Sequence, residues 1–227
     1  MAQARLQVKG LCASFAADGD WQAFPWVVVD FETTGLDAQT HRVLEIGLVC
    51  FDAGELTARH DFLINPQMPV PEEARAVHGI TDEELAQAPT FAELLPRITE
   101  LVQGRLPVAY NASFDRGFLL AELARVGAVD APAPAFDPEV QWIDPLVWVR
   151  ELQKYEKGKK LTDVCARLGI PLDNAHRAAS DAEATGKVLL KLAGKLPRTY
   201  RELVRIQTQY AAAQEAEFAR WRARRGR

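Results

Sequence analysis

The sequence contains few cysteines. Cys12, Cys50 and Cys165 are the three among 227 residues, and their separations match no zinc or disulfide spacing. We expect reduced core or surface thiols, which are usual in cytosolic proteins. The sequence therefore gives no sign of a disulfide scaffold or a cysteine-based metal site.

Long apolar runs are also missing. No stretch approaches the ~20 residues that a membrane span needs. The amino terminus is a poor match to a signal peptide, because the apolar segment at 11–17 is short and acidic residues follow soon after it. We expect a soluble cytoplasmic protein with no membrane partner.

The chain lacks an excess of positive charge. Its 27 lysines and arginines face 31 aspartates and glutamates, giving a net charge of -4. This balance argues against binding of a polyanion over the whole surface, although a local basic patch remains open. Hydrophobic residues make up 48% of the chain, enough for the core of one large domain.

Strand and helix patterns alternate along the sequence. We expect strands at 27–29, 42–51, 59–65 and 106–110, a short last strand at 142–144, and a turn at 52–55 that makes a hairpin. We expect helices near 82–87, 90–103, 114–126 with Gly127 as its cap, 145–154, 161–168, 179–193 and 198–222. This order predicts an α/β fold with a mixed central sheet flanked by helices.

The domain predicted from these patterns spans residues 25–195. It is preceded by an extension at 1–24 and followed by a basic helix at 196–227. This last segment holds eight arginines against three glutamates and could contact a nucleic-acid backbone. It also carries an apolar stripe that could pack on the domain or on a partner, formed by Tyr200, Leu203, Val204 and Tyr210. A solvated helix end is the simpler alternative.

Two carboxylates end the first strand. Asp30 and Glu32 lie two residues apart, so they can project from the same face of the strand. Unpaired and buried, they would cost several kcal/mol, on the order reported for buried charges. A divalent cation between them is the simplest solution, since oxygen ligands suit magnesium or manganese. Surface decoration is the alternative for this pair alone.

A third acid, Asp115, follows the strand at 106–110 and falls in the first turn of the next helix. That is the carboxyl end of a strand, where sites form in α/β folds. Asp115 could instead serve only as a favourable charge at a helix start. Asn111 and Phe114 next to it are not explained by that role.

A histidine and a fourth acid lie close together near residue 180. His176 and Asp181 are five apart, about 140° around a continuous helix. They converge better if His176 lies in the turn before the helix and Asp181 in its first turn. An exposed histidine beside a capping aspartate is the alternative.

Together, the three segments resemble the DEDDh 3′→5′ exonucleases, the DnaQ-like family. The motifs are Asp-Phe-Glu-Thr-Thr-Gly at 30–35, Asn-Ala-Ser-Phe-Asp at 111–115 and His-Arg-Ala-Ala-Ser-Asp-Ala at 176–182. They occur in order, and the resemblance covers about residues 25–195. It implies an RNase H-like fold and hydrolysis of nucleic acid from its 3′ end.

The resemblance also implies two divalent cations, Mg²⁺ or Mn²⁺, held by four carboxylates. Asp30 would bridge both ions, Glu32 and Asp181 would complete the shell of the first, and Asp115 would act on the second largely through water. His176 is then the candidate general base, because an unperturbed imidazole titrates near pH ~6.5. The alternative is that it only orients the attacking water.

Several further residues are candidates for substrate binding, namely Thr33, Thr34, Gly35, Leu36, His78, Asn111 and Phe114. Gly35 would allow close approach of the backbone, and Leu36 could press on the terminal base. His78 could be a surface turn residue instead, and Phe114 a core residue. Glu45 is a fifth acid near the sheet, and the sequence assigns it no role. Asp144-Pro145 departs from the Asp-Thr that relatives often show there, with no expected loss of activity.

The sequence favours single-stranded DNA ends, in proofreading or repair, as the substrate. RNA trimming by the same site is the enzyme alternative, and the sequence shows no contact with a 2′-hydroxyl that would decide between them. A non-catalytic nucleic-acid-binding or polymerase-associated module is less favoured, because all five catalytic residues are present. A polymerase or another protein could bind through the carboxyl-terminal helix.

Overall fold

The computed structural model describes residues 18–128, 133–138, 140–172 and 175–225. Its centre is a four-stranded sheet of β1 (Trp26–Thr33), β2 (Val43–Asp52), β3 (Glu55–Leu63) and β4 (Leu106–Val108). The strands lie in the order β3-β2-β1-β4; β1 pairs antiparallel with β2 and parallel with β4, and β2 pairs antiparallel with β3. The predicted mixed sheet is confirmed.

The hairpin of β2 and β3 forms where the sequence predicts it. Its loop consists of Ala53 and Gly54, both with positive φ, at +50° and +82°. Two successive positive φ angles belong to the type I′ turn, whose twist matches that of paired strands. The segment at 142–144 differs from the prediction: it forms only an isolated parallel bridge between Ile143 and Val108 rather than a strand.

The helices are α1 (Glu72–His78), α2 (Asp82–Leu85), α3 (Phe91–Val102), α4 (Ala112–Arg125), α5 (Pro145–Leu152), α6 (Leu161–Leu168), α7 (Ala178–Leu192) and α8 (Tyr200–Arg225). The sequence predicts all of these except α1, with ends that differ by a few residues. Gly127, at φ +69°, follows α4 in the left-handed conformation expected of a helix cap. In the parts of the chain described, no helix combines the length and apolarity needed to cross a membrane.

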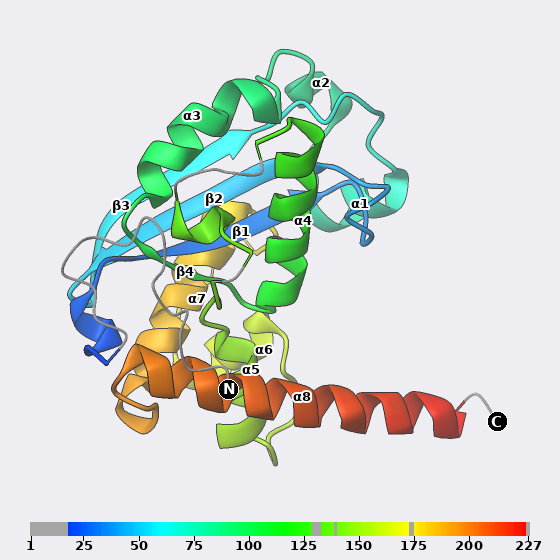
Figure 1. The fold of residues 1–227 in the computed structure, drawn as a ribbon. Coiled ribbons are helices and arrows are strands. Elements are labelled where there is room, and N and C mark those ends of the chain that lie inside the picture. The colour runs from blue at the N-terminus through cyan, green and yellow to red at the C-terminus, as the bar shows by residue number, and fades with distance from the viewer. Residues whose placement is uncertain (1–17, 129–132, 139, 173–174, 226–227) are drawn as a thin grey trace.

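Helices lie on both sides of the sheet (Figure 1). The side chains of β1 alternate between two hydrophobic cores, one on each side. Val27, Val29 and Phe31 pack on the side of α3 and α4. Trp26 and Val28 pack on the other side, together with residues of α5, α6, α7 and α8. Asp30 and Glu32 have the parity of Trp26 and Val28, so β1 directs them toward the α7 side.

The first half of α8 is tied to the domain by buried glutamines. The Gln207 side chain accepts hydrogen bonds from the Asp144 backbone N–H (2.8 Å) and the Trp148 indole (3.3 Å). Gln214 donates to the Val147 carbonyl at 3.0 Å. Beyond Gln214 every described residue of α8 is exposed, and Figure 1 shows this half extending past the other helices.

The described part of the amino-terminal extension packs against the start of α8. Asp20 accepts a hydrogen bond from Arg198 at 2.7 Å, and Asp18 accepts one from Arg201 at 2.7 Å. The Trp21 indole donates to the Pro197 carbonyl, and its side chain is fully buried. Cys50 and Cys165 are buried free thiols, as expected, and Cys12 lies outside the described residues.

Candidate active site

The first-turn acid of α4 reaches across to the end of β1. Asp115 is 2% exposed, and its Oδ1 accepts a hydrogen bond from the Phe31 backbone N–H at 3.1 Å. Phe31 lies between Asp30 and Glu32, so this bond fixes Asp115 beside both acids. The structure thus joins the first two sequence motifs through a residue pair 84 positions apart.

Asp144 sets the position of the start of α4. Its carboxylate accepts hydrogen bonds from the backbone N–H groups of Asn111 and Ala112, both at 3.0 Å. Asn111 adopts a left-handed conformation with φ +71°, which asparagine tolerates better than most residues. Asp144 also caps α5 by accepting from Leu146. Asp144, which the sequence placed at the end of a short last strand, therefore positions Asp115.

The third motif folds as the sequence predicts. His176 lies in the turn before α7 and Asp181 lies in its first turn. The His176 backbone N–H donates to Asp181 Oδ2 at 3.1 Å, with His176 at φ +65°. Ligand atoms of Glu32, His176 and Asp181 all lie within 4.8 Å of one another.

The four acids form one electrostatic unit. Burial raises the pKa of Asp30 well above its usual value, and the charges of Asp115, Asp181 and Glu32 raise it further. Burial, followed by the charge of Asp181, raises the pKa of Glu32 to about 8. Burial likewise raises the pKa of Asp115 and of Asp181. Four ionised carboxylates are therefore unfavourable in this site unless protons or cations are bound to them.

The arrangement suits a metal ion. Asp181 Oδ1 is buried and has no hydrogen-bond partner among the described residues, so one oxygen remains available as a ligand. Carboxylate oxygens are the donors that Mg²⁺ and Mn²⁺ prefer. The donors of Glu32, His176 and Asp181 form a group compact enough for one ion.

A buried glutamate on β2 holds the start of α7. Glu45 is fully buried; its Oε1 accepts from Arg177 Nε and Nη2, and its Oε2 accepts from the Ala178 N–H at 2.9 Å. Gly47, two residues on, has no side chain, and a Cβ there would lie 2.2 Å from the Ala178 carbonyl carbon. Glu45 and Gly47 therefore bring the His176–Asp181 segment against the sheet.

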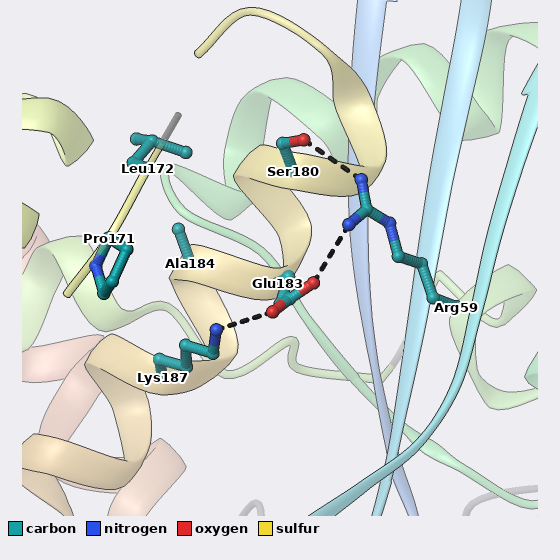
Figure 2. A pocket seen from close by; sticks show the side chains of 7 residues that line it. All are labelled: Arg59, Pro171, Leu172, Ser180, Glu183, Ala184 and Lys187. Atoms are coloured by element: carbon teal, nitrogen blue, oxygen red, sulfur yellow. Dashed lines mark hydrogen bonds and ion pairs between the residues drawn. The ribbon is translucent and has the colours of Figure 1, made fainter. Parts of the chain in front are cut away.

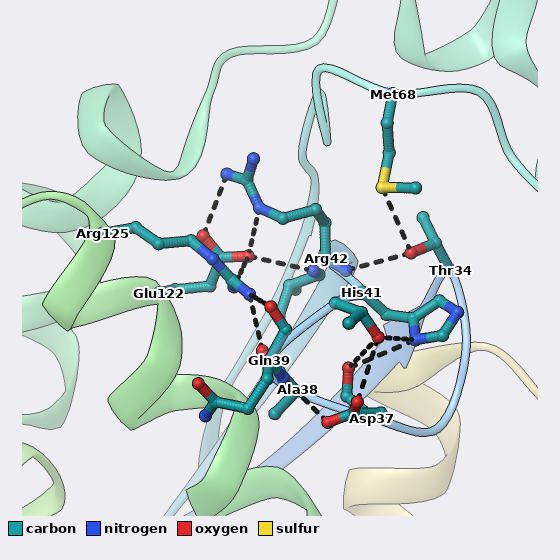
Figure 3. A network of polar contacts seen from close by, with 11 residues as sticks. Thr34, Asp37, Ala38, Gln39, His41, Arg42, Met68, Glu122 and Arg125 are labelled. Carbon is teal, nitrogen blue, oxygen red and sulfur yellow. Dashed lines mark hydrogen bonds and ion pairs between the residues drawn. The ribbon is translucent and has the colours of Figure 1, made fainter.

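A second buried glutamate braces the loop after β1 (Figure 3). Glu122 on α4 accepts from Arg42 at 2.7 and 3.0 Å, from the Val43 N–H at 3.3 Å and from Arg125 at 3.1 Å. Arg125 also donates to the carbonyl of Gln39 at 3.1 Å. The middle and the end of the loop that follows the first motif are thereby attached to α4.

The predicted substrate residues beside β1 differ in exposure. Thr33 donates to the Gly35 carbonyl at 2.7 Å, and Thr34 donates to the Met68 sulfur, so both hydroxyls are used within the chain. A Cβ on Gly35 would lie 2.2 Å from the His41 ring, so a larger residue there would displace that side chain. Leu36 is 87% exposed and available to a ligand.

The remaining predicted contacts lie on α1 and α4. His78 is not a surface residue: it is 7% exposed, and its Nδ1 accepts from the Ile80 N–H at 3.0 Å. Its buried Nε2 has no hydrogen-bond partner in the described chain. Phe114 is partly buried against the core, 4.9 Å from Phe118 between ring centroids. Asn111 is exposed at the start of α4. Substrate contact by these residues stays a prediction.

A separate pocket lies along the outer side of α7 (Figure 2). Arg59, Ser180, Glu183 and Lys187 line it with Pro171, Leu172 and Ala184. Glu183 pairs with both cations, at 3.1 Å to Arg59 and 2.5 Å to Lys187. The two cations share one glutamate, so the lining of the pocket carries a net charge of +1, and none of the four acids belongs to it.

Comparison with known proteins decides the family. A family model described as Exonuclease, RNase T type, matches residues 27–189. The chain belongs to this exonuclease family. The chain is also 35% identical over 167 residues to the DNA polymerase III PolC-type of Bacillus cereus, a match that covers 74% of this chain and 11% of that protein. It is 31% identical over 184 residues to the PolC-type polymerase of Thermotoga petrophila, covering 81% of this chain and 13% of that protein.

Solved structures give the same fold. The nuclease domain of 3'hExo, a DEDDh protein bound to rAMP, superposes with a TM-score of 0.64 at 16% identity over 78% of this chain and 95% of its own. Exonuclease X in complex with 5′ overhanging duplex DNA gives 0.62 at 23% identity over 80% and 99%. The zinc-bound Escherichia coli ExoI–ssDNA complex gives 0.67 at 21% over 77% and 41%. The predicted DnaQ-like 3′→5′ exonuclease family and RNase H-like fold are confirmed.

Proposed function

We propose that this exonuclease removes nucleoside 5′-monophosphates from the 3′ ends of single-stranded DNA in a reaction that requires two divalent cations. The observation that carries the proposal is the convergence of three distant motifs on one point. Asp115 accepts a hydrogen bond from the backbone between Asp30 and Glu32. The ligand atoms of His176 and Asp181 lie within 4.8 Å of that of Glu32. This convergence brings the charge needed to hold cations next to a candidate base.

The carboxylates would divide between the two ions, Mg²⁺ or Mn²⁺. The charges of the other three acids all act on Asp30, so Asp30 would serve both ions. Glu32 and Asp181 would complete one ion's ligands, and Asp115 would serve the other. When bound, the cations would offset the charge of the acids and of the phosphate and stabilise the entering and leaving oxygens.

His176 would take the proton from the attacking water. Its side chain is exposed, and its interaction with Asp181 uses the backbone N–H, so the ring is not committed by that bond. The left-handed backbone at His176 is uncommon for a residue with a side chain and sets the direction of the imidazole. Asp181 thus fixes the histidine's backbone and Glu45 fixes the residues that follow it.

The choice of DNA is supported by the relatives. The curated relatives at 31–35% identity are DNA polymerases of the PolC type. The chain spans about a tenth of the length of those proteins, so the activity of a whole polymerase does not transfer to it. We extend the proposal to ends that a polymerase has left mispaired, since such ends fray into single strands.

The test is hydrolysis of matched DNA and RNA oligomers labelled at the 5′ end, single- and double-stranded, with Mg²⁺ and then with EDTA. We expect a ladder that shortens from the 3′ end, with single-stranded DNA degraded faster than RNA. Asp30→Ala should abolish turnover and weaken ion binding measured by calorimetry. Asp163→Ala, an exposed acid in the first turn of α6, is the matched control and should leave both unchanged. Hydrolysis that persists in excess EDTA, or internal cuts that appear first, would refute the mechanism.

A further inference from the structure

The far half of α8 has no buried residue in the described chain. Residues 215–225 are all exposed, although the helix continues without a break to Arg225. An isolated helical segment of this length is marginal in water, because most helical stability comes from packing on an apolar face. The matched exonuclease region ends at residue 189, so α8 is additional to it.

The apolar stripe of α8 continues beyond the domain. In the packed half, Tyr200, Leu203 and Val204 are buried against the core. At the same helical spacing of three and four residues, Phe218 and Trp221 follow Gln214. Phe218 and Trp221 are 43% and 51% exposed, respectively. The stripe therefore continues beyond the domain as aromatic rings that are open to solvent.

A second segment adds to this surface. Arg150 on α5 lies over the Phe218 ring, 5.0 Å from its centroid, and Gln214 donates to Glu151 at 2.9 Å. The end of α5 therefore lies against the far half of α8. The last residue of α5, Leu152, is 38% exposed, and Tyr155 in the chain that follows is 91% exposed. Four of the seven exposed large hydrophobic residues in the described chain thus belong to these two segments.

Positive charge is concentrated among these aromatics. Segments 150–160 and 215–225 together hold nine lysines and arginines against four glutamates, a local charge of +5. Since the whole chain carries -4, the remainder carries -9. Arg225 lies over the Trp221 ring at 4.4 Å. A polyanion would be attracted to this surface and repelled by the rest.

We infer that segments 150–160 and 215–225 form an accessory binding surface for single-stranded nucleic acid, which holds the strand outside the active site. The inference rests on the proposed function for the identity of the substrate. Exposed aromatic rings between cations are the composition that binds single strands, because bases stack on the rings while the cations contact phosphates. A neutral or acidic protein partner would not account for the charge.

The first experiment measures affinity by fluorescence anisotropy in EDTA, with fluorescent DNA oligomers of about 6 and about 25 nucleotides, lengths that bracket common site sizes. Without cations the active site lacks the ions that would hold a phosphate, so the affinity that remains reports other surfaces. We expect the longer oligomer to bind more tightly. The variant with both Phe218→Ala and Trp221→Ala should lose about 10- to 100-fold in affinity for it, the effect of lost stacking.

Arginine variants separate charge from stacking. The variant with both Arg222→Glu and Arg225→Glu should bind the long oligomer more weakly. The slope of log affinity against log salt concentration should become shallower by about 0.7 for each lost phosphate contact. Arg205→Glu is the matched control, because this exposed arginine lies on the half of α8 that packs on the domain. It should change affinity less than either variant of the far half. Unchanged melting curves would show that the exposed substitutions leave the fold intact.

Three outcomes would overturn the inference. One is equal affinity of the wild type for both lengths, and another is unchanged long-oligomer affinity in both far-half variants. The third is a dimer, seen by light scattering, that Phe218→Ala and Trp221→Ala dissociate without a loss of DNA affinity. Failure of the proposed function looks different: the chain would hydrolyse no oligomer, yet the variants would still lose binding. On the short oligomer, kcat should be unchanged in the far-half variants.

Discussion

Arg177 donates two hydrogen bonds to the fully buried carboxylate of Glu45 across 132 residues of chain, at 2.9 and 2.5 Å. The pair joins β2 to the residue that follows His176. Glu45 therefore acts on the site through the backbone of α7 rather than by touching substrate, as a positioning residue.

Loss of the arginine should cost more than loss of the charge on its partner. Arg177→Ala leaves the fully buried carboxylate of Glu45 without its cation, and we expect destabilisation of about 2–4 kcal/mol, near the range for a broken buried pair. Glu45→Gln keeps the shape and removes the buried charge, so its effect should be smaller. Urea unfolding measures both. The matched control is Arg59→Ala, which removes the more exposed pair with Glu183 and should cost under about 1 kcal/mol. Equal losses for Arg177→Ala and Arg59→Ala would contradict this.

Disruption of the Glu45–Arg177 pair should also change the kinetics. Because Glu45 positions the segment that carries His176, Glu45→Gln should lower kcat more than it raises KM. Arg59→Ala should leave kcat unchanged. A variant that lost only stability would regain the wild-type kcat at low temperature, and such recovery would reduce Glu45 to a purely structural residue.

Without metal, the free energy of unfolding should fall as pH rises from about 5 to about 8. The pKa of Glu32 is about 8 in the folded chain and 4.5 when unperturbed, so the folded chain binds more protons across this window. Glu32→Gln removes this titration and should raise the melting temperature at pH 8 in EDTA by at least about 2–4 °C, the shift given by about 1 kcal/mol at this chain length. Divalent ions should stabilise the wild type more at pH 8 than at pH 6. A melting temperature that rises with pH in EDTA would oppose the prediction.

His176→Ala should lower the rate by about 10²- to 10⁴-fold, the usual contribution of a general base. It should leave ion affinity nearly unchanged, because we propose His176 as the base and not as a ligand. The wild-type rate should rise with pH and then level off, and this rise should be absent in the variant. His41→Ala, on the loop after β1, is the control. A variant that keeps both the rate and its pH dependence would make His176 an orienting residue.

Gly47→Ala should displace the start of α7 from the sheet. A Cβ at this position meets the backbone of Ala178 and Ala179 at 2.2–2.4 Å, and backbone cannot rotate away as a side chain can. We expect lower stability by about 1–3 kcal/mol, typical of overpacking, and a large loss of kcat. Gly194→Ala, where a Cβ would meet nothing within 4 Å, is the control. Equal kcat in the two variants would contradict the role of Gly47.

The sequence predicted the parts of the site that are local. Asp30 and Glu32 share a strand, and His176 and Asp181 share a turn and the start of a helix, so spacing alone suggested their convergence. The roles of Glu45 and Asp144 could not be predicted in this way, because their partners become neighbours only in the folded chain. The sequence named Glu45 only as a fifth acid near the sheet and Asp144 only as the residue before Pro145.

Two elements of the fold were misread for physical reasons. Helix α1 has seven residues and no apolar period, and its signals are Glu72 and Glu73 after a proline and the left-handed Gly79 at its end. Such punctuation could have revealed it. The segment at 142–144 has the composition of a strand, but only Ile143 pairs with β4, which itself has three residues. The composition of a strand does not indicate the length of the neighbouring strand with which it can pair.

The long separations between these partners bear on the order in which the protein folds. The hairpin of β2 and β3 closes over a two-residue turn, whereas Phe31 must find Asp115 across 84 positions and Glu45 must find Arg177 across 132. Contacts between residues distant in sequence form slowly, because the chain loses the entropy of closing a long loop before these contacts can stabilise it. The four acids should therefore meet only in the last steps of folding, and an early intermediate should hold the hairpin without any ability to bind a divalent ion. The active site would then be assembled by the same event that completes the fold.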